Sequence, residues 1–318
     1  MILITEDHVK QLVGIQDALA AVESSFLEQS SGTGYNLPRQ RVRQPKGTLH
    51  IMGAALSRRG YWGYKAYTVT SGTARFSVNL YDISSGELLT IIEADMLGQL
   101  RTGAASAIAT RSLARPDAQV MALFGCGYQA ETQLEAISQV AHLKEVRVYS
   151  RSAEHRDIFA ARMGDRLGLN VFPVESSTNA IENADIITTI TNSRTPVFKG
   201  SELLKGVHIN AAGSNAVIRA ELDVETIRKV DLFFTDDLEQ ARLESGNLVQ
   251  AFERNAFNWS QLHQLADLVA GKLSGRQWED EITLFESHGI ALWDIALAAD
   301  IYEKAHSSGI GTEIDFLR

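Results

Sequence analysis

Residues 121–130, MALFGCGYQA, lead from an apolar run through two glycines into a polar stretch. The run MALF suits a short strand that is buried on both faces. The residues that follow it, YQAETQLEAISQVAHL, place apolar side chains at the spacing of a helix. The glycines allow the tight turn that joins a strand to a helix. This stretch therefore predicts a strand, a turn and a helix in succession.

The same alternation continues on the C-terminal side of this unit. The short runs EVRVYS, ADIITTIT, GVHINAAG and VDLFFTDD are rich in Val, Ile and Phe, and helical patterns such as SAEHRDIFAARMGDRLG separate them. Buried strands that alternate with helices indicate a parallel, doubly wound sheet of the Rossmann type. The predicted fold class is therefore α/β.

The N-terminal region has a different pattern. A helical periodicity covers residues 5–29, and several strand-like runs follow it, with DISSGE as a hairpin turn. We expect these runs to form an antiparallel sheet with strands at residues 37–52, 61–70, 74–83 and 88–93. A helix rich in Ala and Ser is predicted at residues 102–114, and Pro116 ends it. The region is thus expected to form a second, α+β domain.

The turn GCGYQA is the GxGxxA form of the dinucleotide-binding fingerprint, in the strand–turn–helix context that this fingerprint requires. Gly125 permits the tight turn, Gly127 lets a pyrophosphate approach the backbone, and Ala130 lets helix and strand pack closely. The free N–H groups at the start of the helix favour a phosphate. Glycines that serve only the turn are the alternative. The predicted cofactor-binding residues of this turn are Gly125, Gly127, Tyr128, Gln129 and Ala130.

The end of the next strand, EVRVYSRS, indicates which dinucleotide is bound. NAD-binding proteins usually have an Asp or Glu here for the ribose 2′-OH, whereas this chain has Ser150, Arg151 and Ser152. A guanidinium suits the 2′-phosphate of NADP. We therefore predict NADP(H) as the preferred cofactor. NAD(H) is the alternative if Arg151 is only a solvated loop residue.

The bulk composition excludes several classes of protein. Of the 318 residues, 45% are hydrophobic and 22% are charged, so disorder is not expected, and the net charge of −9 argues against nucleic acid and anionic membranes as partners. No apolar run is long enough to span a membrane, and the acidic start, MILITEDH, is unlike a signal peptide. The single cysteine, Cys126, fits a reducing compartment, so we expect a cytoplasmic protein. No zinc-ligand spacing such as CxxC or HExxH occurs, and no metal site is predicted.

The stretch HINAAGSNAVIRAELD begins as a strand and continues like the start of a helix. Its polar centre, with Asn215, would lie at the C-terminal end of a strand, where open α/β sheets bind their ligands. The Asn215 amide can donate and accept hydrogen bonds but cannot exchange a proton at pH 7. The alternative is that Asn215 caps the next helix or fills a turn.

Four motifs together resemble one protein family. In chain order, GYKAYTVT, LGQLRTGAASAIATRSLARPD, MALFGCGYQAETQ and GVHINAAGSN are similar to the ornithine cyclodeaminase/mu-crystallin family, over nearly the whole chain. The resemblance implies a substrate-binding and dimerisation domain at residues 1–113, completed by a C-terminal helix at 290–318. It also implies an NADP-binding Rossmann domain at residues 114–289. A homodimer that pairs through the N-terminal domain follows from the same resemblance.

The resemblance also implies roles for several cations. Lys65 in GYKAYT matches the family's substrate-contacting lysine, and Arg101, which precedes the small-residue helix, matches its carboxylate-binding arginine. The family has a further N-terminal arginine, for which PRQRVR offers Arg39, Arg41 and Arg43; in a regular strand all three point the same way, and we favour Arg41. Two Arg and one Lys suit a planar carboxylate, and thus a small anionic substrate that resembles an amino acid. For each cation alone, an exposed surface position is the alternative.

In the family's cyclodeaminases an aspartate stands where this chain has Asn215. A carboxylate can hold and deprotonate the amine that closes the ring, whereas an amide cannot. The resemblance therefore favours a reductase of proline metabolism, which would reduce the cyclic imine Δ1-pyrroline-2-carboxylate or Δ1-piperideine-2-carboxylate to L-proline or L-pipecolate with NAD(P)H. The alternatives are an ornithine or lysine cyclodeaminase, an alanine dehydrogenase or opine-type enzyme, and a non-catalytic NADP-binding protein of the mu-crystallin type.

The predicted catalytic residues of such a reductase are Lys65, Asn215 and His288. Lys65 or a water would protonate the imine nitrogen, and Asn215 would hydrogen-bond the ring nitrogen or the nicotinamide amide. His288 would act as an acid or orient a water, with a structural histidine at a helix start as the alternative. Further residues predicted to line the cofactor site are Thr191, Asn192, Gly213, Ser214, Asn215 and Gly289.

Overall fold

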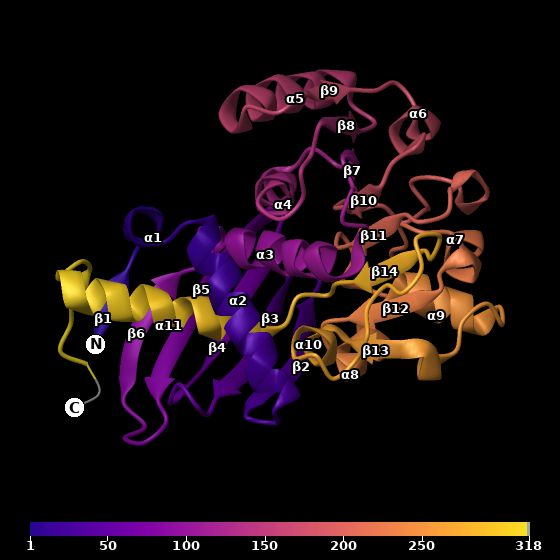
Figure 1. The fold of residues 1–318 in the computed structure, drawn as a ribbon. Helices are drawn as coiled ribbons and strands as arrows, with labels where there is room; N and C mark the ends of the chain where they lie inside the picture. The colour runs from indigo at the N-terminus through magenta and orange to yellow at the C-terminus, as the bar shows by residue number, and fades with distance from the viewer. Residues whose placement is uncertain (317–318) are drawn as a thin grey trace. The chain divides into compact units, whose positions relative to one another are not determined.

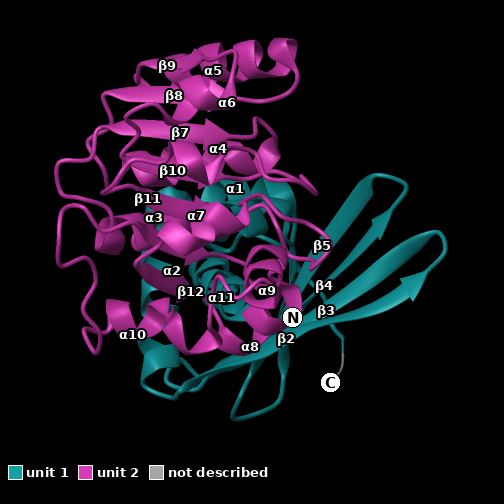
Figure 2. Cartoon of the chain, turned by 90° about the vertical axis from the view of Figure 1, so that its right-hand side faces the viewer, with its two compact units in different colours: residues 1–101, 290–318 teal, residues 102–289 magenta. Residues whose placement is uncertain are grey.

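The computed structural model describes residues 1–316, which divide into two compact units (Figure 2). Unit 1 comprises Met1–Arg101 and the C-terminal segment from Ile290 onward, and unit 2 comprises Thr102–Gly289. The expected boundary after residue 113 lies at the end of helix α3 (Asp95–Leu113), whereas the division between the compact units falls within this helix. The C-terminal segment belongs with the N-terminal region, so unit 1 is discontinuous in sequence.

Unit 1 contains a seven-stranded sheet in the order β15-β1-β6-β5-β4-β3-β2. Its strands are β1 (Ile2–Ile4), β2 (Gly34–Gln44), β3 (Gly47–Leu56), β4 (Tyr61–Thr70), β5 (Thr73–Asp82), β6 (Leu88–Glu93) and β15 (Thr312–Glu313). Neighbouring strands are antiparallel except for β1 and β6. The predicted DISSGE hairpin is present, because the Asp82 carboxylate accepts the backbone N–H groups of Ser84 and Ser85 after β5 ends.

Two expected elements of unit 1 are each divided in the structure. The run at residues 37–52 is not one strand but the hairpin of β2 and β3, which turns at Pro45 and Lys46. The helix expected at residues 5–29 is interrupted and forms α1 (Glu6–Leu12) and α2 (Ile15–Ser30). Gly14 is extended and its N–H donates to the Asp17 carboxylate, so it begins a second helix rather than continuing the first.

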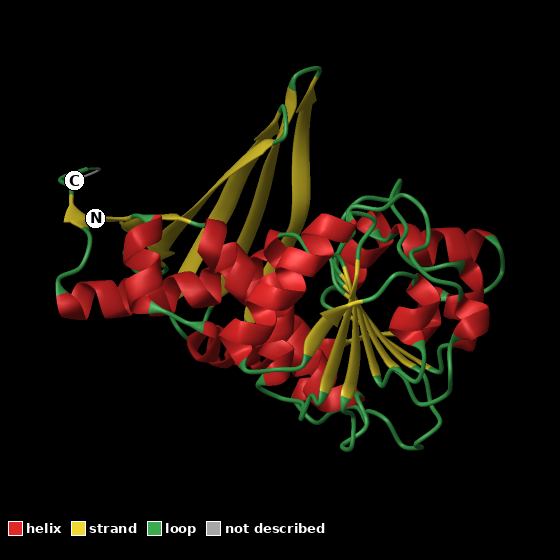
Figure 3. Cartoon of the chain, turned by 90° about the horizontal axis from the view of Figure 1, so that it is seen from above, coloured by secondary structure: helices red, strands yellow, loops and turns green. Residues whose placement is uncertain are grey.

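The C-terminal helix α11 (Ala291–Ser308) packs in unit 1 against α2 and against β3 and β4 (Figure 1). Its first half is buried on every side, from Ala291 to Ala299. Figure 3 shows the helices of unit 1 gathered on one face of its sheet. This face therefore carries the core of unit 1.

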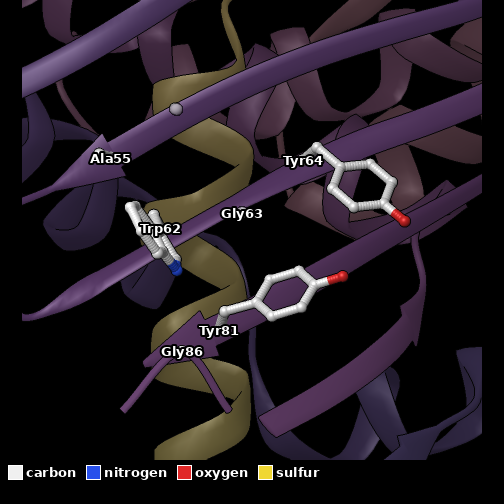
Figure 4. Close-up of a pocket in the computed structure, with 7 residues that line it drawn as sticks. Ala55, Trp62, Gly63, Tyr64, Tyr81 and Gly86 are labelled. Carbon is white, nitrogen blue, oxygen red and sulfur yellow. The ribbon is translucent and has the colours of Figure 1, made fainter. Parts of the chain in front are cut away.

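The opposite face of the unit 1 sheet is apolar and exposed. Tyr35, Ala55, Trp62 and Tyr81 form one cross-strand row on it. A hollow of about 490 Å³ is lined there by Trp62, Tyr64 and Tyr81, whose side chains are drawn in Figure 4. Other large apolar side chains exposed on β2 and β3 are Leu37, Val42, Leu49 and Ile51.

Unit 2 contains an eight-stranded sheet in the order β13-β12-β14-β11-β10-β7-β8-β9. Every pair of neighbours is parallel, which confirms the predicted fold class. The strands are β7 (Val120–Phe124), β8 (Glu145–Tyr149), β9 (Val171–Pro173), β10 (Ile186–Thr189), β11 (His208–Ala211), β12 (Leu232–Thr235), β13 (Leu262–Gln264) and β14 (Thr283–Glu286). The helices that follow α3 are α4 (Tyr128–Ser138), α5 (Ala153–Leu167), α6 (Ser177–Ile181), α7 (Val224–Lys229), α8 (Leu238–Glu244), α9 (Gly246–Glu253) and α10 (Leu265–Val269), with 3-10 turns at Gly200–Glu202 and Trp259–Gln261.

The strand order of unit 2 reverses direction between β7 and β10, which are neighbours in the sheet. The chain winds from β7 through β8 to β9 on one side, and β10, β11 and β14 lie on the other. Such a reversal opens a crevice at the C-terminal ends of the strands, where open α/β sheets bind dinucleotides. Among the described residues, no helix is long and apolar enough to cross a membrane.

Candidate active site

A buried cluster of three charged side chains lies in unit 1. Lys65 on β4 donates from Nζ to Asp294 Oδ1 at 2.9 Å, and Arg101 donates from Nε to the same oxygen at 3.2 Å. Lys65 is 3% exposed and Asp294 is fully buried. A buried carboxylate that two cations share keeps all three side chains charged in a place where charge is otherwise costly.

The surroundings of the cluster fix its geometry. Lys65 Nζ lies 5.1 Å from the centre of the Phe76 ring, and the Arg101 guanidinium lies 5.6 Å from that of Trp293. A Cβ added at Gly98 would lie 3.0 Å from Lys65 Nζ, so the glycine leaves room for the ammonium group. Asp294 Oδ2 is buried and has no hydrogen-bond partner among the described residues.

The cluster combines two cations, Lys65 and Arg101, with one carboxylate, Asp294. It therefore carries one net positive charge and suits an anionic ligand.

Arg39 extends this cationic region, and it lies in an irregularity of β2. The pairing register of β2 with β3 shifts by one residue between Leu37 and Gln40, which is a β-bulge. The bulge interrupts the alternation of side chains, and Arg39 is buried at 7% exposure. The charges of both Arg101 and Arg39 act on Lys65 to lower its pKa. Arg39 is thus close enough to Lys65 to influence it.

Arg41, which we favoured from the sequence, has a different environment. It pairs with His50 of β3 and is half-buried, and Arg43 is exposed. Burial, together with the charges of Arg41, Arg39 and Arg43, lowers the pKa of His50 to about 4, so the ring is neutral at pH 7. Arg39 is thus more deeply buried than Arg41, and its charge lowers the pKa of Lys65. Arg39 therefore fits the Lys65 cluster better than Arg41 does.

Burial gives Lys65 an unusual protonation equilibrium. It lowers the lysine pKa from 10.5 to about 8, with the charge of Asp294 acting upward and that of Arg101 acting downward. An ammonium group with a pKa near 8 is protonated at neutral pH and can give up its proton readily. Lys65 can thus bind an anion and also donate a proton.

Asp294 was not among the sequence candidates. Its only signal was that it stands as a single carboxylate within the apolar run ALWDIALAA. Its partner Lys65 lies 229 positions earlier in the chain, so local sequence reasoning could not pair the two residues. Arg101 also differs from its expected position, because α3 begins at Asp95 and Arg101 lies within the helix rather than before it.

In unit 2 the fingerprint turn has the geometry that dinucleotide binding needs. Gly125 has φ +109°, and a Cβ there would lie 2.5 Å from the Ile190 carbonyl oxygen, so only glycine fits. Gly127 is the N-cap of α4, and no atom lies within 4 Å of where its Cβ would be. Ala130 is buried, whereas Tyr128 is exposed and Gln129 is half-buried. The open space before the helix N-terminus suits a pyrophosphate.

A cavity of about 320 Å³ connects this turn with the ends of β8 and β10. Ser150 and Arg151 line it, together with His155, which sequence reasoning missed, and with Thr191 and Asn192. No Asp or Glu is among the residues that line this cavity. Ser152 does not line it; its hydroxyl accepts the N–H of His155 as the N-cap of α5. The lining residues fit a nicotinamide dinucleotide.

The loop after β11 corrects one expectation. The helix expected in the second half of HINAAGSNAVIRAELD is absent there: residues 212–223 form a loop, and α7 begins at Val224 with Asp223 as its N-cap. Asn215 lies inside this loop and caps no helix. Ser214 is buried and its hydroxyl donates to backbone oxygens of the same loop, 3.3 Å to that of Ala216.

His288 and Gly289 lie in the loop between β14 and α11. His288 is buried, and its backbone N–H donates to the Asp236 carboxylate at 2.8 Å. Its ring Nδ1 is 3.3 Å from the carbonyl oxygen of Ser214. Gly289 has φ +74°, a conformation that favours glycine. The backbones of these two residues and the Gly213–Ser214 turn therefore belong to one connected region of unit 2.

Comparison with known proteins agrees with this geometry. The model of the ornithine cyclodeaminase/mu-crystallin family matches residues 1–309. A Δ1-pyrroline-2-carboxylate reductase of Bacillus cereus is 37% identical over 99% of this chain and 100% of its own length. The structure of Thermococcus litoralis Δ1-pyrroline-2-carboxylate reductase, in complex with NADH and L-proline, superposes with a TM-score of 0.95 at 32% identity and covers 99% of this chain and 100% of its own. An archaeal alanine dehydrogenase dimer with bound NAD gives a TM-score of 0.94 at 32% identity and covers 100% of this chain and 99% of its own. The chain therefore belongs to the ornithine cyclodeaminase/mu-crystallin family.

Proposed function

We propose that this protein reduces a cyclic imine carboxylate with NAD(P)H, converting Δ1-pyrroline-2-carboxylate or Δ1-piperideine-2-carboxylate to L-proline or L-pipecolate. The observation that carries the proposal is the buried cluster of Lys65, Arg101 and Asp294, which combines an excess of positive charge with a lysine whose pKa is about 8. The similar reductase of Thermococcus litoralis binds NADH and L-proline. The carboxylate of a cyclic imine suits the positive charge of the cluster, and its ring nitrogen suits a lysine that can donate a proton.

Each side chain of the cluster has a separate task in this reaction. Arg101 binds the substrate carboxylate through its fork, with Arg39 as the second arginine in place of Arg41. Lys65 donates its proton to the imine nitrogen, which makes the adjacent carbon more electrophilic. Asp294 keeps Lys65 and Arg101 in place. The dinucleotide, bound at the fingerprint turn, would supply the hydride.

Asn215 and His288 are the remaining catalytic candidates. The Asn215 amide can hydrogen-bond the ring nitrogen or the nicotinamide amide, but it cannot deprotonate an amine as an aspartate would. This argues against a cyclodeaminase. His288 can orient a water or act as an acid, and its ring is close to the Ser214 carbonyl group beside Asn215.

Reductive amination of pyruvate is the second candidate, because the archaeal alanine dehydrogenase superposes almost as closely as the reductase. The same cations would bind the carboxylate of pyruvate. The two reactions differ in where the nitrogen comes from: a cyclic imine carries it within the ring, and alanine dehydrogenase takes it from ammonia.

The proposal is tested by incubating the protein with NADPH and Δ1-pyrroline-2-carboxylate. We expect the NADPH absorbance to fall and L-proline to form in equal amount, and we expect Lys65→Met to abolish both. Ammonia release from ornithine with catalytic NAD would point instead to a cyclodeaminase. Tight NADPH binding without turnover of any imine would point to a binding protein of the mu-crystallin type.

A preference for NADP(H) over NAD(H) is part of the proposal. It is supported by the exposed Arg151 and by the lack of a carboxylate among the residues that line the cavity. Ser150→Asp would place a negative charge where the 2′-phosphate binds. We expect this variant to lower kcat/KM for NADPH by about tenfold or more and to spare NADH, as measured by steady-state kinetics with both cofactors. An unchanged ratio would contradict the preference.

A homodimer through unit 1 is also part of the proposal. The support is the apolar outer face of the sheet, with Leu37 and Trp62 exposed at 55% and 45%. Contiguous exposed apolar surface of this kind marks a protein interface, and the similar alanine dehydrogenase is a dimer. A cytoplasmic location is proposed because Cys126, the single cysteine, is free and fits a reducing compartment.

A further inference from the structure

Three buried carboxylates lie at or near the C-terminal ends of strands in unit 2. Asp236 follows β12, Glu286 ends β14, and Glu221 lies in the loop after β11. None of the three is more than 1% exposed. Burying a carboxylate is costly unless donors satisfy it, so the identity of the donors shows what each carboxylate does.

Glu221 links the loops that follow β10 and β11. Its Oε1 accepts the N–H of Thr191 at 2.7 Å and the hydroxyl of Thr191 at 2.6 Å. Its Oε2 accepts the N–H of Gly213 at 2.9 Å and the hydroxyl of Thr189 at 3.0 Å. A Cβ at Gly213 would lie 2.2 Å from the Thr191 nitrogen, so the two loops are in direct contact. One side chain thus fixes the spacing between the two loops.

Asp236 fixes the third loop in the same way. Its Oδ2 accepts the N–H groups of His288 at 2.8 Å and Gly289 at 2.7 Å, and the Gly289 carbonyl accepts from Gln240 Nε2 at 2.8 Å. The backbone of the loop after β14 is therefore held from both its N–H and its C=O groups.

Asn247 and Glu286 connect Glu221 with the end of β14. The side-chain Oδ1 of Asn247 accepts the backbone N–H of Glu221 at 2.8 Å, and its Nδ2 donates to Glu286 Oε1 at 3.0 Å. Ser245 also donates to Glu286, at 2.7 Å. Burial raises the pKa of Glu286 to about 8, so this carboxyl is neutral at pH 7. Burial raises the pKa of Glu221 and of Asp236 as well, and the hydrogen bonds that each accepts act in the opposite direction. The network thus holds the loops through the neutral Glu286 carboxyl.

The three loops lie on one half of the crevice. In doubly wound sheets the dinucleotide crosses the point where the strand order reverses, with its adenosine half over the first strands. Here β7 and β8 carry the fingerprint turn and Arg151, so β10, β11 and β14 lie under the nicotinamide half. We propose that Glu221 and Asp236 are positioning residues for the nicotinamide half of the cofactor: they touch neither cofactor nor substrate but fix the loops that do.

This inference rests on cofactor binding, which is part of the proposed function, but not on turnover of any imine. It is tested by calorimetric titration with NADPH and with 2′-phospho-ADP-ribose, which lacks the nicotinamide. Glu221→Gln replaces one acceptor oxygen with a donor, so one of the two loops loses its backbone hydrogen bond. We expect the NADPH affinity to fall about tenfold and the affinity for the fragment to stay within about twofold. Asp236→Asn should show the same selectivity.

Asp185→Asn is the matched control. The Asp185 carboxylate also accepts two backbone N–H groups, those of Gln119 and Val120 at 2.8 and 2.9 Å, but beside the first residues of β7 and β10. We expect this variant to change the affinities for NADPH and for the fragment equally, or neither of them. If Glu221→Gln folds poorly, Thr189→Val removes only one hydroxyl donor of Glu221 and should show the same selectivity with a smaller loss. Equal losses for NADPH and the fragment in these variants, or no loss of either, would overturn the inference.

Discussion

Asp294 opposes the effect of burial on the pKa of Lys65. Burial and the charges of Arg101 and Arg39 all lower the pKa of Lys65, and among the charges that act most strongly on it only that of Asp294 opposes them. If Lys65 donates the proton, activity is present while the lysine is protonated and is lost as the pH rises through about 8. The alkaline limb of the pH profile therefore reports on this one ion pair.

Asp294→Asn should shift that limb. Without the carboxylate charge the pKa of Lys65 falls, so kcat/KM for imine reduction should be lost at a lower pH than in the parent protein. The measurement is the pH dependence of kcat/KM for both proteins. Asp300→Asn is the control, because Asp300 is on the same helix and pairs with Arg59 at 2.8 Å, away from Lys65. A limb that does not move in Asp294→Asn would exclude Lys65 as the titrating proton donor.

Single substitutions can distinguish the roles of the three arginines of β2. Arg39 is buried in the bulge, Arg41 is half-buried beside His50, and Arg43 is exposed. We expect Arg39→Gln to raise KM for the imine by about tenfold to a hundredfold, because a buried charged partner of the carboxylate is lost. Arg43→Gln should change KM little. A larger effect of Arg41→Gln than of Arg39→Gln would show that Arg41 binds the carboxylate, as expected from the sequence.

Among the helices, strands and turns, sequence patterns predicted correctly those whose conformation depends on residues next to them in the chain. The fingerprint turn was predicted correctly, because Gly125, Gly127 and Ala130 act through the backbone next to them. The start of α3 was missed, because the N–H groups of Asp95 and Met96 donate to Glu6, far away in sequence. The bulge that buries Arg39 depends on pairing with β3, which no periodicity within β2 reveals.

The end of β14 gives a prediction about stability. Because Glu286 has a raised pKa in the folded protein, its contribution to the free energy of unfolding is complete below pH 4.5 and is lost as the pH rises to about 8. Glu286→Gln is neutral at every pH. We expect the melting temperature of the parent protein to fall more steeply between pH 4.5 and about 8 than that of the variant, as measured by calorimetry. Equal slopes would show that Glu286 is ionised in the fold.

At the level of the whole molecule, the outer face of the unit 1 sheet should be an interface. Leu37→Glu adds a charge to this face at a side chain that is 55% exposed. We expect the variant to be monomeric at concentrations where the parent protein is a dimer, as measured by analytical ultracentrifugation, because burying an unpaired charge opposes association. Ile158→Glu on α5, at 57% exposure, should leave the dimer intact. Dissociation in neither variant would place the interface elsewhere.

The fold of both units could be predicted from the sequence, because alternation of apolar runs and helical patterns depends only on neighbouring residues. The site could be predicted only in part. Lys65 and Arg101 came from resemblance to a family, and Asp294, which connects them, lies in the last helix. Residues that act through partners elsewhere in the chain, such as Glu221 and Asp236, leave no local pattern.

The most direct test of the account compares two nitrogen sources with the same enzyme and cofactor. NADPH oxidation would be followed with Δ1-pyrroline-2-carboxylate and, separately, with pyruvate plus ammonia. We predict that kcat/KM for the cyclic imine exceeds that for pyruvate by about a hundredfold or more, because the ring imine carries its own nitrogen into the Lys65 cluster. Oxidation of NADPH only with pyruvate and ammonia would contradict the account and identify an alanine dehydrogenase.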